Sequence, residues 1–200
     1  MKIICVGRNY AEHAKELGNA IPEKPVLFLK PDTALLKSGE AFYHPDFSQD
    51  VHHEAELVLK IGKMGKRIQE KFALGYISEI TLGIDFTARD IQAEQKKKGL
   101  PWEIAKAFDG SAPIGDFIPF APDTDYNFFL LKNGDTVQEG NPGMMLFNFA
   151  QLISYISGYF TLKTGDLIYT GTPAGVGPVK MGDVLEGFLN GKKVLHTEVK

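Results

Sequence analysis

Three acidic residues, Glu54, Glu56 and Asp85, have the type and spacing that a metal site requires. Across residues 53–61, apolar and polar side chains alternate, and this period of two is typical of a half-buried β-strand. Glu54 and Glu56 are two residues apart, so their carboxylates project from the same face of that strand. Asp85 ends a second apolar run, residues 80–84. Three oxygen ligands brought together form a site for a hard cation, and Mg²⁺ or Mn²⁺ suits it.

An exposed acidic strand surface is the alternative for Glu54 and Glu56, because charged side chains are mostly solvated. Two considerations favour the metal site. Three like charges on one surface repel one another unless a cation neutralises them. The rest of the chain also supplies the other groups that such a site uses.

His13 and Glu16 are three residues apart in a segment that is expected to be helical, so their side chains share one helix face. A carboxylate beside an imidazole fixes the tautomer of the ring and raises its basicity, and such a pair can act as a general base toward water. The alternative is an exposed pair on a charged helix that also carries Glu12 and Lys15. The spacing alone leaves both interpretations open.

Arg89, Gln92 and Lys96 are spaced by three and four residues and form one polar stripe on an expected helix. Arg89 follows Asp85 by four residues, so its guanidinium could bind a substrate carboxylate in a bidentate manner beside the metal. An amphipathic helix with a solvated face explains the stripe equally well. Lys96 also begins the only basic run, residues 96–98, where lysines at a helix end complement the dipole.

Lys106 and Thr172 are weaker candidates. Lys106 lies among largely apolar residues in segment 102–108, which suits a partly buried ammonium that stabilises an anion. Lysines also extend from apolar surfaces for no catalytic reason. Gly171 permits a close backbone approach and the Thr172 hydroxyl can donate to a substrate oxygen, although a plain glycine-rich turn is the commoner meaning of such a sequence.

Short strands, several of them in hairpins, must position these residues. Single strands are expected at residues 2–6, 26–29, 54–61, 76–85 and 166–170. Two hairpins are expected where Asn133-Gly134 joins 126–132 to 136–138, and where Asn190-Gly191 joins 184–189 to 193–199.

Four helices are expected between these strands. They run from Asn9 to about Leu17, near residues 69–74, from Thr87 to Gly99, and from Phe149 to Ser157. Asn9 and Thr87 are predicted N-caps, because an acidic residue follows each of them three positions later. Strands outnumber helices and the βαβ alternation of nucleotide-binding folds is missing, so the pattern predicts a strand-rich α+β protein with a single domain spanning residues 1–200.

The composition argues against several functional classes. A net charge of −3 over 200 residues argues against a general nucleic-acid binder, which carries a basic excess. Cys5 is the sole cysteine, so an intrachain disulfide and a cysteine-based zinc site are excluded, and its apolar neighbours indicate a buried thiol. There is no signal-peptide pattern, and no apolar run approaches the roughly 20 residues of a membrane helix, so we expect a cytoplasmic protein without a membrane partner.

Taken together and in order, these segments resemble the fumarylacetoacetate hydrolase family, specifically its short acylpyruvate hydrolase and oxaloacetate decarboxylase members. The matching segments are Gly7-Arg8-Asn9-Tyr10-Ala11-Glu12-His13, Leu27-Phe28-Leu29-Lys30-Pro31, His53-Glu54-Ala55-Glu56-Leu57, Asp85-Phe86-Thr87-Ala88-Arg89-Asp90, Lys97-Lys98-Gly99-Leu100-Pro101-Trp102, Ala105-Lys106 and Thr170-Gly171-Thr172-Pro173-Ala174-Gly175-Val176-Gly177. The resemblance spans nearly the full chain.

The resemblance implies a role for each candidate residue. The metal ligands would be Glu54, Glu56 and Asp85, holding one Mg²⁺ or Mn²⁺. The catalytic residues would be Lys106 and the pair His13 and Glu16 on a mobile N-terminal lid. Substrate contacts would be Arg8, Arg89, Gln92 and Thr172. The implied fold is a mixed β-roll with peripheral short helices, assembled as a homodimer.

The activity implied by the resemblance is metal-dependent cleavage of a carbon–carbon bond in a small 2-oxo acid. In acylpyruvate hydrolysis, the His13–Glu16 pair deprotonates water, hydroxide attacks the 4-carbonyl, and a pyruvate enolate departs. Oxaloacetate gives the same enolate by loss of CO₂, without activated water. The alternatives are a 2-hydroxyhepta-2,4-diene-1,7-dioate isomerase or oxaloacetate tautomerase that uses the same metal site, and an inactive oxo-acid-binding module.

Overall fold

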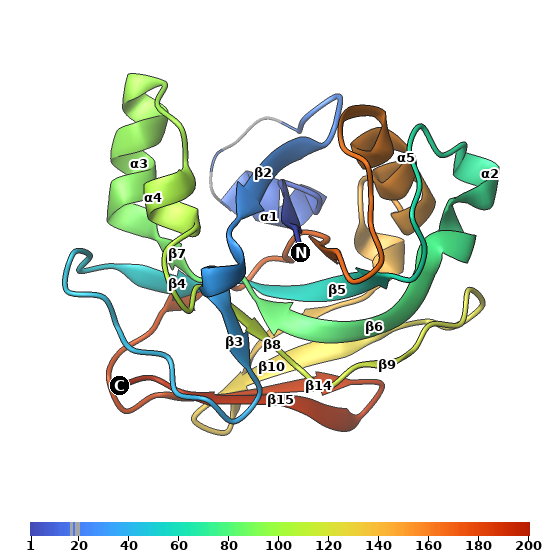
Figure 1. Ribbon diagram of the computed structural model, residues 1–200. Helices are drawn as coiled ribbons and strands as arrows, with labels where there is room; N and C mark the ends of the chain where they lie inside the picture. Colours follow the sequence, from blue (N-terminus) through green and yellow to red (C-terminus); the bar gives the residue numbers. More distant parts are fainter. Residues whose placement is uncertain (17, 19–20) are drawn as a thin grey trace.

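A curled mixed sheet forms the centre of the computed structural model, which describes residues 1–16, 18 and 21–200 (Figure 1). Its strands, in spatial order, are β2 (Val26–Lys30), β1 (Ile3–Gly7), β12 (Leu167–Tyr169), β5 (Ala55–Ile61), β6 (Ile77–Ile84), β8 (Ala112–Ile114) and β3 (Leu35–Lys37), with β9 (Ile118–Pro119) beside β6. The pairs β1–β12 and β3–β8 are parallel and the others are antiparallel, so the predicted mixed sheet is confirmed.

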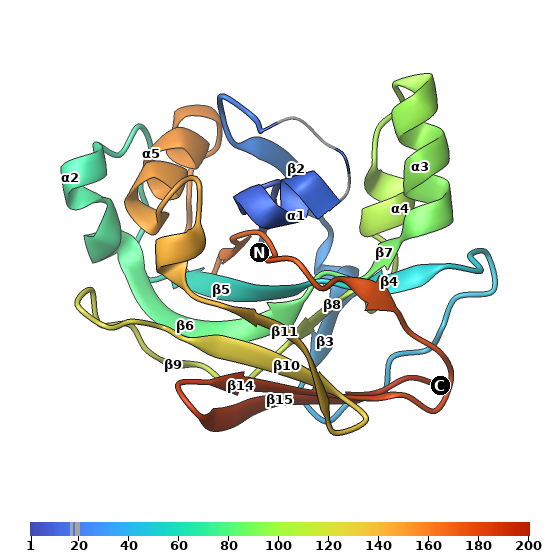
Figure 2. The same ribbon diagram turned by 180° about the vertical axis from the view of Figure 1, so that it is seen from behind.

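Two smaller sheets and five α-helices complete the fold in the part of the chain that the structure describes. The four-stranded sheet contains β11 (Asp135–Gly140), β10 (Phe128–Lys132), β14 (Val184–Leu189) and β15 (Lys192–Glu198), and the three-stranded one contains β13 (Gly177–Pro178), β4 (Val51–His53) and β7 (Thr87–Ala88). The helices in the described residues are α1 (Ala11–Glu16), α2 (Glu70–Ala73), α3 (Arg89–Lys98), α4 (Glu103–Lys106) and α5 (Phe149–Tyr159). Figures 1 and 2 show the helices on one side of β5 and β6 and the four-stranded sheet on the other.

Local signals set the hairpins and the longest helix. Both Asn-Gly pairs turn with positive φ at each residue, 55° and 91° at Asn133-Gly134 and 48° and 78° at Asn190-Gly191, which is the backbone of a type I′ turn. Asn148 and Gln151 form a capping box at the start of α5. Leu152, Ile153 and Ile156 then place a buried apolar face on the core. No helix in the described part of the chain has the length and apolar character to cross a bilayer.

Two predicted N-caps are wrong. The Asn9 side chain does not cap α1, because its amide donates to the carbonyls of Phe147 (3.0 Å) and Thr170 (2.8 Å) and its oxygen accepts the Phe147 N–H (2.8 Å). Asn9 therefore joins distant segments instead. The predicted helix end near Leu17 lies outside the described residues, and Gly18 has the positive φ of 62° expected of a helix stop.

Thr87 does not cap α3 either, because it lies in β7 and the helix starts at Arg89. Its hydroxyl accepts a hydrogen bond from Lys106 Nζ at 2.6 Å. Asp90 accepts the hydroxyl of Ser48 (2.7 Å) and so joins α3 to the loop before β4. Thr87 and Asp90 therefore form tertiary hydrogen bonds in place of the predicted capping box.

Strand β5 is buried on both faces, so the prediction of a half-buried strand is wrong. Leu57 and Leu59 lie in the main core, while Val58, on the opposite face, packs in a second cluster with residues such as Ile3 and Tyr169. The strand is central, between β12 and β6, and the curl of the sheet covers its second face. Glu56 on β5 therefore faces an enclosed interior, whereas Lys60 near the other end of the strand stays partly exposed and pairs with Glu79.

Candidate active site

Three carboxylates meet inside the curled sheet. Glu54, Glu56 and Asp85 each offer one oxygen, and these atoms all lie within 4.8 Å of one another. Antiparallel pairing of β5 with β6 sets Ala55 opposite Ile84, and the Asp85 N–H donates to the Glu54 carbonyl (2.8 Å) just beyond that pair. The three residues are 1–5% exposed, which contradicts the alternative of an exposed acidic surface.

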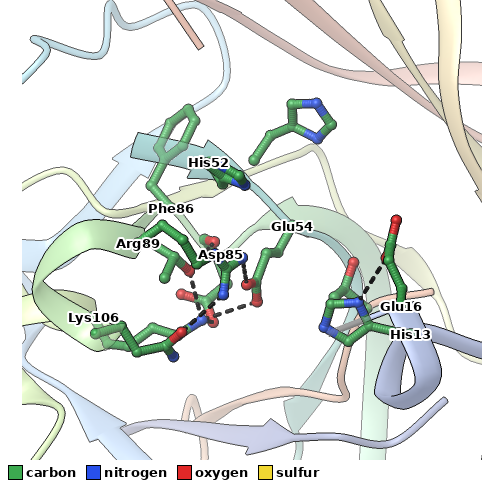
Figure 3. A network of polar contacts seen from close by, with 12 residues as sticks. His13, Glu16, His52, Glu54, Asp85, Phe86, Arg89 and Lys106 are labelled. Carbon is green, nitrogen blue, oxygen red and sulfur yellow. Dashed lines mark hydrogen bonds and ion pairs between the residues drawn. The ribbon is translucent and has the colours of Figure 1, made fainter. Parts of the chain in front are cut away.

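Lys106 holds two of these carboxylates together. Its ammonium donates to Glu54 Oε2 (2.9 Å), Asp85 Oδ2 (2.6 Å) and the Thr87 hydroxyl (2.6 Å), which uses all three of its protons. Burial alone would lower the pKa of Lys106, but Asp85 and Glu54 outweigh it and raise the pKa, so the group stays cationic. Figure 3 shows this convergence, with His13 and Glu16 to one side.

Two further cations contact the cluster. Arg89 Nη2 lies 2.5 Å from Glu54 Oε1, and Lys30 Nζ lies 2.7 Å from Asp85 Oδ1. Burial would raise the pKa of Glu54, yet Lys106 and Arg89 hold it well below its usual value. Lys30 belongs to a segment that carries the family resemblance, but no spacing or neighbour in the sequence indicated a role for it.

A divalent cation fits this donor set. Glu56 accepts the Gly171 N–H (2.7 Å) but has no ion-pair partner among the described residues, and burial, Asp85 and Glu54 raise its pKa well above the usual value. Asp85 Oδ1 is buried and, although Lys30 is near, it accepts no well-aligned hydrogen bond. These oxygens need positive charge, and Mg²⁺ and Mn²⁺ prefer oxygen donors.

His13 and Glu16 form the pair that their spacing suggested. His13 Nδ1 lies 3.3 Å from Glu16 Oε2, and His13 is only 5% exposed, so the exposed-pair alternative fails for the imidazole. Both Glu16 oxygens also accept the Gly175 N–H (3.2 and 3.3 Å), which attaches α1 to the glycine-rich loop. Burial is the main cause that lowers the pKa of His13, so the ring is neutral at pH 7. With Nδ1–H donating to Glu16, Nε2 is free to accept a proton.

The polar stripe on α3 belongs to the same site. Arg89 Nη1 donates to Gln92 Oε1 (2.8 Å), and Gln92 is 3% exposed, so this helix face is not solvated. Lys96 follows one turn later, half-buried, and lies over the Trp102 ring at 5.5 Å from its centroid.

One small cavity brings the predicted residues together. It is lined by Val6, Gly7, Arg8, His13, Phe28, Glu54, Glu56, Asp85, Arg89, Gln92, Lys96, Trp102, Lys106 and Thr172. Every candidate from the sequence is therefore on its wall except Glu16, which contacts it through His13. The cavity holds about 30 Å³, room for a water or two, so an organic substrate requires part of this lining to move.

Gln138 is a site residue that the sequence did not reveal. Its buried amide oxygen accepts the Ala55 N–H (2.9 Å) and lies 3.0 Å from His53 Nδ1, and its amide nitrogen donates to the Thr172 hydroxyl (2.8 Å). The Thr172 oxygen thus accepts one hydrogen bond, and its own hydroxyl donates to the Pro173 carbonyl at 3.5 Å, a long bond that an acceptor in the cavity could replace. Gln138 lies within the hairpin strand β11, with no local pattern that distinguishes it.

Known proteins resemble this chain over nearly its full length. The chain matches the family Fumarylacetoacetate (FAA) hydrolase C-terminal over residues 2–200. Oxaloacetate tautomerase FAHD1, mitochondrial, from Mus musculus is 44% identical over 201 residues, covering 99% of this chain and 91% of that protein. Oxaloacetate decarboxylase, mitochondrial, from Dictyostelium discoideum is 47% identical over 194 residues, covering 95% and 89%.

A solved structure extends the comparison to the fold. Fumarylpyruvate hydrolase from Pseudomonas aeruginosa, crystallised in complex with Mn²⁺ and pyruvate, aligns with a TM-score of 0.93 and 37% identity, covering 100% of this chain and 89% of that one. The strand-rich α+β fold and the sequence match therefore lead to one conclusion: the chain belongs to the fumarylacetoacetate hydrolase family.

Proposed function

We propose that this protein is a divalent-metal-dependent enzyme that cleaves a carbon–carbon bond in small 2-oxo acids, as an oxaloacetate decarboxylase, an acylpyruvate hydrolase, or both. The observation that carries the proposal is the cluster of three buried carboxylates beside Lys106 and His13 in one cavity. The names of the relatives, which include a decarboxylase and a fumarylpyruvate hydrolase, support the reaction class.

Glu54, Glu56 and Asp85 would hold the Mg²⁺ or Mn²⁺ ion. When bound, the ion would act as a Lewis acid that polarises the 2-oxo group of the substrate. The Mn²⁺ in the Pseudomonas aeruginosa structure supports this assignment.

Lys106 would stabilise the negative charge that develops on the substrate. Its ammonium is fixed by three hydrogen bonds in a buried position and needs little reorganisation during the reaction. Arg8, Arg89, Gln92 and Thr172, which share the cavity wall, would bind the oxygens of the substrate.

His13 would be the general base in hydrolysis. Its neutral ring, oriented by Glu16, takes a proton from water, and the resulting hydroxide attacks the 4-carbonyl of an acylpyruvate. The C3–C4 bond then breaks, its electron pair forms the pyruvate enolate, and protonation at C3 gives pyruvate and a carboxylate. Decarboxylation releases CO₂ and leaves the same enolate, so it needs no base to activate water.

A second candidate is oxaloacetate tautomerase or the related dienedioate isomerase activity. The name of the mouse relative favours tautomerisation, and a neutral His13 could remove a C3 proton without cleavage of the carbon skeleton. Proton NMR of oxaloacetate in the presence of the enzyme separates the two reactions, because only decarboxylation accumulates pyruvate above the uncatalysed rate.

The decisive experiment is a panel of oxaloacetate, acetylpyruvate and fumarylpyruvate, each with Mg²⁺ or Mn²⁺ and scored by pyruvate release. We expect turnover of at least one substrate, and loss of turnover after treatment with EDTA. Turnover that persists without metal contradicts the metal assignment. No turnover of any substrate, together with oxo-acid binding, identifies an inactive binding module.

We also propose that the chain is a single catalytic domain that forms a homodimer in the cytoplasm, whereas the curated relatives are named mitochondrial. An apolar surface groove of about 930 Å³ supports self-association, since its lining includes the exposed residues Phe47 (55%) and Ile104 (66%). Light scattering should give the dimer mass for the wild type and the monomer mass for Ile104→Asp. A monomeric wild type contradicts the homodimer.

A further inference from the structure

Two cations of the cavity wall have no anionic partner among the described residues. Lys106, Lys30 and Arg89 each contact a carboxylate of the cluster. Arg8 and Lys96 line the same cavity but form no ion pair within the part of the chain that the structure describes. Arg8 Nε is also buried without a hydrogen-bond partner. A buried guanidinium nitrogen without an acceptor is costly, and an anionic ligand would satisfy it.

The backbone fixes Arg8 at this wall. Arg8 has φ of 60°, in the left-handed region that residues other than glycine rarely adopt. The next residue, Asn9, is bound on both sides by Phe147 and Thr170, so the surrounding structure maintains this conformation. The guanidinium is thus presented to the cavity from a rigid turn between β1 and α1.

Lys96 reaches the cavity from the last turn of α3. Its half-buried side chain passes over the Trp102 ring, and a Cβ added to Gly7 would lie 3.5 Å from that same ring, so Lys96 and the Gly7–Arg8 turn both adjoin Trp102 at this wall. Burial first, and then Arg89 and Arg8, lower the pKa of Lys96 to about 8. Positive charge is therefore crowded at this wall, where an anion is missing.

We propose that Arg8 and Lys96 form a second anion subsite, which binds the distal carboxylate of a dicarboxylic 2-oxo acid. This inference rests on the proposed function, in which the 2-oxo and adjacent carboxylate groups bind at the Glu54, Glu56 and Asp85 end of the cavity. A guanidinium and an ammonium together make charge-assisted hydrogen bonds to one carboxylate. The site then prefers oxaloacetate and fumarylpyruvate to acetylpyruvate, which has no second carboxylate.

Lys96→Gln tests the subsite by turnover. The ratio of kcat/KM for oxaloacetate or fumarylpyruvate to that for acetylpyruvate should fall by about ten- to a hundredfold, mainly through KM, as expected for loss of a charged hydrogen bond. Lys96→Arg should restore most of the ratio. Lys97→Gln is the matched control, because it removes the same charge from the neighbouring, exposed position and should leave the ratio unchanged.

Arg8→Asn is the second variant, since Asn tolerates positive φ and so removes the guanidinium without new backbone strain. It should lower the same ratio. An equal loss on all three substrates, or no change in the ratio for either variant, would overturn the subsite.

Binding of unreactive acids separates this inference from the proposed function. Malate and lactate are both 2-hydroxy acids, and only malate carries a second carboxylate. In calorimetric titrations with Mg²⁺, the wild type should bind malate at least tenfold more tightly than lactate, and Lys96→Gln should remove most of that preference. Equal binding of the two acids by the wild type refutes the subsite even when turnover is observed. A malate preference without turnover of any oxo acid supports the subsite and refutes the proposed activity.

Discussion

At its start, strand β5 buries opposite kinds of side chain on its two faces, although Val58 further along the carboxylate face is apolar. On one face, Leu57 and Leu59 are fully buried in the main apolar core. On the other, Glu54 and Glu56 are 5% and 2% exposed within the carboxylate cluster. Burial of a leucine side chain stabilises the fold by about 1.5–3 kcal/mol, whereas burial of a carboxylate destabilises it unless the charge is paired. One strand thus provides stability on one face and the candidate chemistry on the other.

Substitutions of adjacent residues should separate these two contributions most strongly. Glu56→Gln removes a proposed metal ligand, so turnover should fall by at least about a thousandfold, while the free energy of unfolding of the metal-free protein at pH 7 stays the same or rises. Burial raises the pKa of Glu56, so the folded protein binds more protons than the unfolded chain and its free energy of unfolding falls as pH rises. Gln does not ionise and so avoids this loss of stability, and it can still accept the Gly171 N–H.

Leu57→Ala is the matched substitution on the apolar face. It should lower the free energy of unfolding by about 2–5 kcal/mol in urea titrations, because Leu57 is fully buried. The kcat of the remaining folded enzyme should change little. A destabilised Glu56→Gln protein, or an inactive but stable Leu57→Ala protein, contradicts the division of labour between the two faces.

Lys106 should stabilise the folded protein by neutralising the carboxylate cluster. Lys106→Met leaves Glu54 and Asp85 without their shared ammonium, and loss of one partner from a buried ion cluster costs about 3–5 kcal/mol of unfolding free energy. Lys98→Met breaks the exposed pair of Lys98 with Glu94 and should cost less than about 1 kcal/mol. Equal effects of the two substitutions in thermal and urea unfolding would show that the buried ammonium is not needed for neutralisation.

His13 should distinguish the two proposed cleavage reactions. His13→Gln should lower acylpyruvate hydrolysis by about 10²–10⁴-fold, and oxaloacetate decarboxylation much less, because only hydrolysis needs an activated water. Burial lowers the pKa of His13, so its base form persists on acidification and the acid-side decline of wild-type kcat/KM for hydrolysis should lie at lower pH than an ordinary histidine would give. His196→Gln, on the distant strand β15, is the control. Equal losses in both reactions would refute this role of His13.

The sequence predicted those parts of the molecule that local rules determine. The Asn-Gly turns need only neighbouring residues, and they formed as expected, as did the helix from Phe149, which a local capping box starts. The alternation over residues 53–61 correctly put Glu54 and Glu56 on one face, but it could not show that the sheet curls over that face. Asn9 and Thr87 matched a capping pattern, yet each is bound by a residue far away in the chain.

Long-range contacts explain what the sequence could not reveal in the site. Local spacing identified His13 with Glu16, and the carboxylate trio, as candidates. The resemblance to the family supplied their proposed roles. Gln138 was not found because its partners lie between 34 and 85 residues away and no periodic pattern marks it.

Substitution of Gln138 should have the smallest effect on activity. It tests whether a residue outside the cavity wall positions the Thr172 hydroxyl. Gln138→Glu keeps an acceptor for the Ala55 N–H but cannot donate to Thr172, so the Thr172 hydroxyl turns its hydrogen toward the new carboxylate and away from the cavity. We expect kcat/KM to fall by about tenfold, as for loss of one substrate hydrogen bond. Thr172→Val should cause a similar loss, and the double variant should lose little more, because both changes remove the same interaction. Full additivity of the two losses would show that Gln138 acts on something other than the Thr172 hydroxyl.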